Sequence, residues 1–297
     1  MHIMRAILLM ILAMALLALS DVFIKLSSQV LSPGYVMFGL SVGGTLCFML
    51  IAKWQGANLL SQDALHPWVL ARSALEIMGG LGLVLSIGLI PLSLFAAIMQ
   101  MAPLVVTLGA AVFLKEPVGL RRWLAIFAGI VGMLLVIKPG TEGFEPAALF
   151  AVMGVCGLGL RDLITRLSPA HIPSISLATW GFAATIPIGV GLILLAEAPT
   201  GVTPITLWHM GAGIVVTALG YYAVTQAMRM APAAIVSPFR YTRLIFTMSL
   251  GILIFGERPD SLTLLGAAII LSAGLYALYR ERKLALEQNR ARVRSGR

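Results

Sequence analysis

A duplicated segment constrains the fold of this sequence more than any other feature. Residues 91–116 and 232–257 each begin with a proline, continue through an apolar run and end on a glutamate. The two segments are offset by 141 residues (232 − 91), and the same offset relates Asp21 to Asp162. The chain therefore contains one unit of about 140 residues twice, which is a common arrangement in transporters.

Long apolar runs fill both units and predict an all-helical integral membrane protein. Hydrophobic residues make up 59% of the chain and charged residues 11%, whereas soluble domains carry about 25% charged residues. A helix that crosses a bilayer needs about 20 mostly apolar residues. Because the first run has an internal counterpart, we expect a retained helix there and not a cleaved signal peptide. Ten transmembrane helices are predicted, at 5–26, 34–53, 67–90, 92–114, 121–138, 146–165, 172–195, 206–229, 233–255 and 261–280.

Each unit contains five such helices, and an odd number reverses the direction of the second unit in the membrane. We therefore predict two inverted five-helix repeats, 1–140 and 141–280, followed by a basic tail at 281–297. Lysine and arginine are concentrated on one side of this arrangement, with fifteen residues there against three on the other. That asymmetry predicts that both termini are cytoplasmic.

The C-terminal tail carries much of the net charge of +9. Residues 280–297 hold seven basic and two acidic side chains, which leaves +5. A basic stretch of this kind is also found in proteins that bind nucleic acid. Beside a membrane helix, however, it favours a cytoplasmic anchor on anionic lipid headgroups. We expect lipid and not nucleic acid as its partner, and the sequence leaves a homodimer open.

Several short motifs connect the chain with a known family. They are Ala13–Met14–Ala15 with Asp21 and Lys25, Pro91–Leu92–Ser93, Ala102–Pro103–Leu104, Glu116, Lys138–Pro139–Gly140, Ser237 to Arg243, and Gly256–Glu257. In these motifs the sequence resembles the drug/metabolite transporter superfamily, specifically its ten-helix EamA-like members, over nearly its whole length. The resemblance implies a carrier with a central cavity lined mainly by the third, fourth, eighth and ninth helices. It implies no single substrate, because the superfamily includes exporters of amino acids and drugs and importers of vitamins and cofactors.

Charged side chains inside the predicted helices are candidate substrate-binding residues, because a charge at bilayer depth is costly. Arg72 and Glu76 lie four residues apart on one helical face, where they form either part of a binding site or an ion pair that only stabilises the bundle. Arg240 and Arg243, with Tyr241 between them, have no acid in their own helix. Guanidinium groups suit carboxylates and phosphates. We hypothesise an anion-accepting cavity here, unless Glu76 reaches across to neutralise them.

Two further charge pairs occupy equivalent places in the two repeats. Asp21 and Lys25 are four residues apart, as are Asp162 and Arg166, and the pairs are predicted near opposite membrane faces. Their duplication suggests gate or hinge contacts at the two ends of the cavity. The alternative is that both pairs only anchor helix ends at the membrane surface.

Prolines and glutamates mark the fourth and ninth predicted helices. Pro103 and Pro238 are predicted inside helices, where proline removes a backbone hydrogen bond and clashes with the preceding turn. We expect kinks there that act as hinges. Glu116 and Glu257 end helices, where they are expected to bind backbone or neighbouring helices and not substrate.

The motifs of several other protein classes are absent from the sequence. There is no Walker-type loop for an ATP-driven motor and no His-Glu-x-x-His zinc motif. The four histidines are too scattered in sequence to suggest a metal site. We therefore expect no catalytic residues, cofactor or metal, and a carrier instead of an enzyme.

These observations together predict a multi-pass secondary carrier of the bacterial inner membrane that works by alternating access. The favoured function is export of an anionic or zwitterionic metabolite, such as an amino acid or related carboxylate. Uptake of a vitamin or nucleotide-like cofactor is the alternative within transport, and a membrane-embedded enzyme or sensor is the alternative outside it. Gln100 and Tyr221 complete the candidate substrate-binding set, although a helix-packing or interfacial role is favoured for either one alone.

Overall fold

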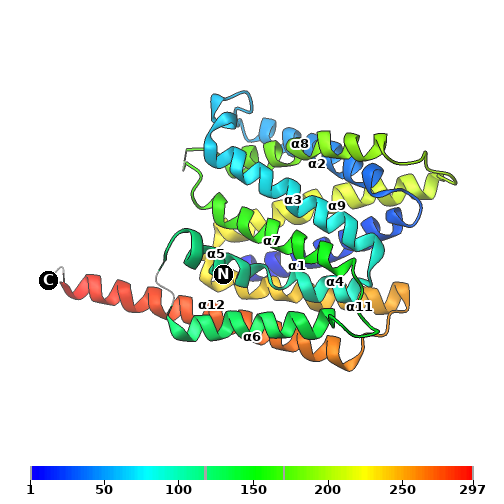
Figure 1. Ribbon diagram of the computed structural model, residues 1–297. Helices are drawn as coiled ribbons and strands as arrows, with labels where there is room; N and C mark the ends of the chain where they lie inside the picture. The colour runs from blue at the N-terminus through cyan, green and yellow to red at the C-terminus, as the bar shows by residue number, and fades with distance from the viewer. Residues whose placement is uncertain (1, 117–118, 170, 296–297) are drawn as a thin grey trace.

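The chain forms a bundle of long, roughly parallel and antiparallel helices with both ends of the chain at the same end of the bundle (Figure 1). The computed structural model describes residues 2–116, 119–169 and 171–295, and no strand occurs in these ranges. The helices are α1 (His2–Ser28), α2 (Pro33–Trp54), η1 (Gln62–Leu65), α3 (Pro67–Leu89), α4 (Leu92–Met99), α5 (Ala102–Phe113), α6 (Leu120–Ile137), α7 (Ala148–Thr165), α8 (Ser174–Leu194), α9 (Pro204–Met230), α10 (Ala233–Val236), η2 (Ser237–Tyr241), α11 (Thr242–Phe255) and α12 (Ser261–Ser295).

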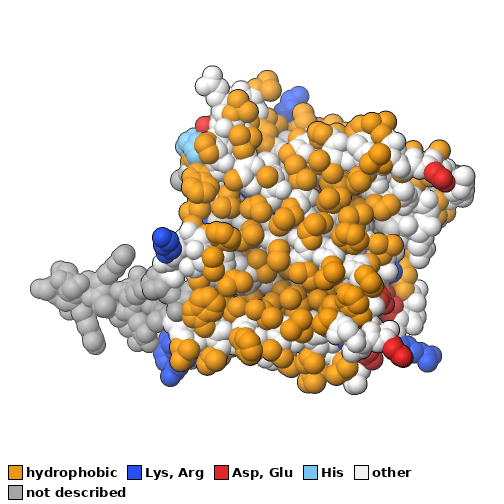
Figure 2. All heavy atoms as spheres, viewed as in Figure 1, with side chains coloured by type: hydrophobic (Ala, Val, Ile, Leu, Met, Phe, Trp, Pro, Cys, Tyr) orange, Lys and Arg blue, Asp and Glu red, His pale blue; other side chains and the backbone are white. Residues whose placement is uncertain are grey.

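The predicted all-helical membrane fold is confirmed. Over the described residues, nine helical segments are long and apolar enough to cross a membrane, with α4 and α5 counted as one. The ninth predicted helix, 233–255, is divided into α10, η2 and α11. Figure 2 shows an apolar surface around the middle of the bundle, with charged side chains mainly toward its two ends. Such a band is what a lipid environment requires.

Packing between the helices repeats with the 141-residue offset. The helix α1 packs along α9, and the equivalent α7 packs along α3. A Cβ atom at Gly79 would lie 2.7 Å from Cγ of Leu158, and one at Gly220 would lie 3.0 Å from Cγ of Leu17. These two contacts relate residues by the same offset with the partners exchanged. Each half therefore packs its first helix against the third helix of the other half.

Both halves interrupt their fourth helix at the same place. The break between α4 and α5 lies at Gln100–Met101, and the 3₁₀ segment η2 ends at Tyr241, the repeat equivalent of Gln100. Pro103 lies in the first turn of α5, not inside a continuous helix. Its ring would clash with the carbonyl four residues earlier, at Met99, which is where α4 ends. Pro238 likewise lies in the first turn of η2, which begins at Ser237. The hinge role of both prolines stays a prediction.

We use two names for the ends of the bundle. The tail end is where α12 leaves the bundle, and the loop end is the opposite one, which contains Ile90 and Glu257. The side chains of residues 281, 282 and 284–297 lie outside the described residues, so the predicted lipid contacts of the tail have no structural counterpart here.

At the loop end, Asp260 caps the last helix. It accepts a hydrogen bond from Thr263 N at 2.8 Å and pairs with Lys138. These contacts lower the pKa of Asp260 to about 2, the hydrogen bond from Lys138 being the largest cause. We predict that Asp260→Ala costs about 1 kcal/mol of stability, as loss of a helix cap typically does. Because the folded pKa is depressed, this contribution is complete above about pH 4 and is lost as pH falls through about 2. Thermal unfolding at pH 7 and at pH 2 checks this, and an equal difference at both pH values would contradict it.

Candidate functional site

The centre of the bundle contains ion pairs that join its two halves. The carboxylate of Asp21 on α1 is 2% exposed and accepts hydrogen bonds from Arg243 on α11 at 2.7 and 3.2 Å. Thr247 Oγ1, one turn further along α11, lies 3.4 Å from the same carboxylate. A buried carboxylate that accepts hydrogen bonds from two nitrogens of a guanidinium fork is fixed in orientation. The first and ninth membrane segments are therefore locked together at this point.

A second cluster joins α3 and α7. The Glu76 carboxylate forms ion pairs with Arg72, at 3.1 Å, and with Arg161, at 2.8 Å. Arg161 also pairs with its neighbour Asp162 at 2.6 Å. Arg72 is almost fully buried and donates to the carbonyl of Leu177 on α8 at 2.7 Å. The helices α3, α7 and α8 are thus connected by one network in which acidic and basic side chains alternate.

Arg240 differs from the other arginines of this region. Its side chain is 42% exposed, and its one ion pair among the described residues is with Asp162, at 3.6 Å. That separation is longer than a hydrogen bond, so donor capacity remains. Four arginines face three acids over both clusters, which leaves one net positive charge. Arg240 and Asp162 thus present a partly exposed guanidinium and carboxylate side by side.

The partners of the predicted charges differ from those expected in sequence. Arg243 pairs with Asp21 and not with Glu76, so it is not a free anion-binding group. Lys25 contacts Glu257, and not Asp21 four residues before it. Asp162 pairs with arginines 161 and 240, while no partner of Arg166 is found among the described residues. Neither Asp21 with Lys25 nor Asp162 with Arg166 forms an ion pair, whereas Arg72 and Glu76 do.

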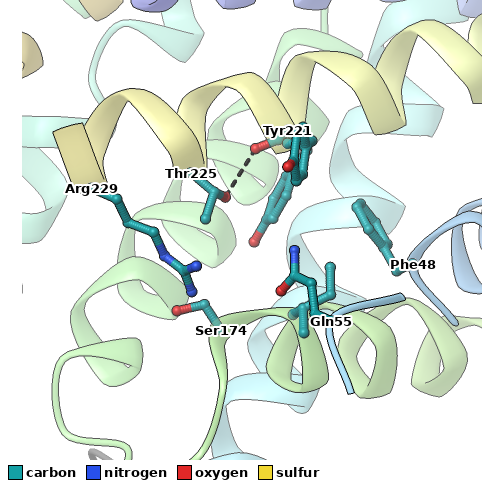
Figure 3. A pocket seen from close by; sticks show the side chains of 8 residues that line it. Phe48, Gln55, Ser174, Tyr221, Thr225 and Arg229 are labelled. Atoms are coloured by element: carbon teal, nitrogen blue, oxygen red, sulfur yellow. Dashed lines mark hydrogen bonds between the residues drawn. The ribbon is translucent and has the colours of Figure 1, made fainter. Parts of the chain in front are cut away.

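The aromatic and amide candidates lie in two places. Gln100 is buried at the break between α4 and α5, and Tyr241 is buried at the end of η2 against Gly274. The Tyr241 hydroxyl has no hydrogen-bond partner in the described structure. Tyr221 lines a cleft between α2, α8 and α9 that also contains Phe48 (Figure 3). This cleft has a volume of about 10 Å³, enough for one water molecule and not for a metabolite.

Two residues of the charge networks carried no separate site prediction. Arg161 is one residue before Asp162, and the sequence places it at a helix end near other basic residues. The sequence feature that could have identified Arg161 is its position next to Asp162, which the repeat relates to Asp21. Glu257 was expected to bind backbone or a neighbouring helix, and it accepts from the amides of Leu92 and Ser93. No group of three metal-binding side chains occurs in the described ranges.

Comparisons with known proteins agree with this architecture. The model of the EamA-like transporter family matches residues 4–138 and 145–279, one match for each repeat. The riboflavin transporter of Rhizobium johnstonii is 35% identical over 73% of this chain and 72% of its own length. The S-adenosylmethionine uptake transporter of Rickettsia bellii is 27% identical over 77% of this chain and 78% of its own.

An exporter and a solved structure are also similar. The pseudopaline exporter of Pseudomonas aeruginosa is 29% identical over 93% of this chain and 96% of its own length. A solved crystal structure aligns with a TM-score of 0.64 and 17% identity, over 94% of this chain and 98% of the other. At that identity the likeness supports the fold alone.

Proposed function

The chain belongs to the EamA-like transporter family, and from that premise we propose that it exports a small anionic or zwitterionic metabolite. It is a multi-pass, small-molecule transporter of the bacterial inner membrane. The proposal concerns the substrate and the direction. Relatives named as riboflavin, S-adenosylmethionine and pseudopaline transporters include both uptake and export.

The observation that carries the substrate proposal is the state of Arg240. It is the most exposed arginine of the two charge clusters, and its pair with Asp162 is long, at 3.6 Å. A substrate carboxylate binds a guanidinium through two parallel hydrogen bonds. An amino group on the same substrate would approach Asp162. A zwitterion therefore finds both of its partners here, and a simple carboxylate finds one.

Uptake of riboflavin or a similar vitamin is the second candidate. It is favoured by the 35% identity to a riboflavin transporter over 73% of the chain. A neutral, flat vitamin would depend less on Arg240 and more on aromatic side chains of the bundle. Tyr221 and Tyr241 are the candidates for such stacking in another state of the carrier, because here Tyr241 is buried and the cleft at Tyr221 has room for one water molecule. The two proposals therefore differ in how strongly binding should depend on Arg240.

We predict that Arg240→Gln weakens binding of an anionic or zwitterionic substrate by about 10-fold to 100-fold, the range for a hydrogen bond to a charged group. Purified protein would be screened for thermal stabilisation by amino acids, small carboxylates, S-adenosylmethionine and riboflavin, because a ligand of the native state raises its apparent stability. Arg258→Gln is the matched control, since Arg258 is exposed in the loop before α12. Unchanged affinity in Arg240→Gln would contradict the anionic proposal, and stabilisation by riboflavin alone would favour the second.

A further inference from the structure

A three-part contact holds the loop end of the bundle closed. The Glu257 carboxylate accepts from the backbone amides of Leu92 and Ser93, at 2.8 Å for Ser93, and so caps the first turn of α4. Lys25 on α1 lies 3.5 Å from the same carboxylate and donates to the carbonyl of Ile90 at 2.5 Å. We call this contact the loop-end latch. It fastens α1 and the end of α11 to the junction of α3 and α4.

The repeat supplies the same parts at the tail end. The equivalents of Glu257 and Lys25 are Glu116 and Arg166, and the helical segment equivalent to α4 begins after Pro232. The chain turn that presents the glutamate is also repeated. Glu116 N donates to Ala110 O at 3.1 Å and Glu257 N donates to the equivalent carbonyl of Gly251 at 3.3 Å. The residue before each glutamate has a positive φ, 52° at Lys115 and 65° at Gly256.

Only one of the two sets is assembled. Glu116 and Arg166 are both exposed, and neither side chain forms an ion pair or hydrogen bond with any described residue. Lys25 and Glu257, in contrast, are 13% and 10% exposed. Lysine 115 tolerates a left-handed conformation that is unfavourable for a residue with a Cβ. The backbone turn at Lys115 and Glu116 thus matches the turn at Gly256 and Glu257, although the Glu116 carboxylate has no contact equivalent to those of Glu257.

Other repeat-related positions differ between the two ends in the same sense. The helix α4 packs on α11, and α1 packs on α3. In the described part of the chain, no comparable packing joins α10 and η2 to α5, or α7 to α9, which are the equivalent pairs. Ile87 near the loop end is fully buried, whereas its repeat equivalent Met228 near the tail end is 36% exposed. Lipid exposure cannot explain this, because related positions would face lipid equally. The helices thus pack more tightly at the loop end than at the tail end.

We propose that Glu116 and Arg166 form a tail-end latch that closes when the loop-end latch opens. In that state Glu116 would accept from the backbone amides of residues 233 and 234, and Arg166 would pair with Glu116 and donate to the carbonyl of Ala231. The two sets alternate because a carrier opens to one side at a time. This inference rests on the chain being a carrier and is independent of the substrate.

Matched cysteine reporters test the proposal without any substrate. Ile87→Cys and Met228→Cys are made separately after Cys47→Ser and Cys156→Ser, and purified protein in nanodiscs is treated with a water-soluble maleimide. With both glutamates present, we expect fast labelling in the Met228→Cys protein and slow labelling in the Ile87→Cys protein. Adding Glu257→Gln should speed the Ile87→Cys reaction and slow the Met228→Cys reaction, each by about tenfold, because a charge-assisted contact is lost from one state only.

The decisive step adds Glu116→Gln to the Glu257→Gln proteins. We expect Met228→Cys labelling to return to its fast rate, because the tail-end latch is then also lost. Glu142→Gln, at another exposed acid near a helix end, is the control and should change neither rate. If Glu257→Gln does not fold, Lys25→Gln replaces it. Should Glu116→Gln leave both labelling rates unchanged in the latch-weakened protein, Glu116 has no partner in any populated state and the proposal is overturned.

Discussion

Replacing Asp21 with asparagine is expected to destabilise the protein by about 3–5 kcal/mol, the cost of leaving one member of a buried ion pair without its partner. The carboxylate is 2% exposed and neutralises Arg243 through contacts of 2.7 and 3.2 Å. Asparagine has nearly the same shape but no charge, so the partly buried Arg243 guanidinium would lose its counter-charge. Unfolding of purified protein by heat or denaturant measures the loss.

The matched variants separate charge pairing from side-chain shape. Glu142→Gln alters an exposed acid in the loop between α6 and α7 and should change stability by less than about 0.5 kcal/mol. The double variant Asp21→Asn/Arg243→Gln should be more stable than Asp21→Asn alone, because no unpaired charge is left. If the double variant is as unstable as the sum of the single variants, the two residues do not act as a pair.

Adding a single methyl group where α3 crosses α7 should also destabilise the protein. A Cβ atom at Gly82 would lie 2.6 Å from the Gly154 Cα and from the Phe150 carbonyl oxygen. These are backbone atoms, so relief requires the helices to separate. We expect Gly82→Ala to cost about 1–3 kcal/mol, with lower yield of folded protein. Small residues allow such close approach in membrane proteins, where packing drives helix association.

The same helix provides the control for this substitution. Gly80 is two residues away, and a Cβ there would meet only Thr185 Cγ2, at an ordinary 3.9 Å. Gly80→Ala should therefore be neutral or slightly stabilising, since alanine favours helix. Equal loss in both alanine variants would point to glycine flexibility in α3 and against a close crossing with α7.

The arrangement of helices follows from the sequence to a large extent. Apolar runs predict nearly all the segments, and the 141-residue offset predicts which helices are equivalent. The offset also relates side-chain contacts. Ser20 forms a hydrogen bond with Thr217, and their repeat equivalents, Arg161 and Glu76, form an ion pair. The pattern of apolar residues does not predict the break between α4 and α5, just before Pro103. A kink at the proline was expected, but the break falls two residues earlier because the clash is with the preceding turn.

The ion-pair partners are harder to predict, because most of them come from distant parts of the sequence. Arg243 is 222 residues from Asp21, and Glu257 is 165 residues from Leu92. Spacing of four residues favours partners on the same helix, and it succeeded for Arg72 with Glu76. It failed for Asp21, where a guanidinium on another helix was better placed. The side of the membrane that each end faces stays a prediction from the positions of lysine and arginine.

Solute counterflow in proteoliposomes tests the central claim most directly. Purified protein is reconstituted into vesicles that are empty or loaded with an unlabelled solute, and the labelled solute is added outside. Glutamate, S-adenosylmethionine and riboflavin would be tried in turn. A carrier whose two halves exchange roles predicts transient accumulation of one label in loaded vesicles only, abolished for an anionic solute by Arg240→Gln. Equal entry into empty and loaded vesicles, or entry of none of these solutes and of no compound that stabilises the protein, would contradict the account.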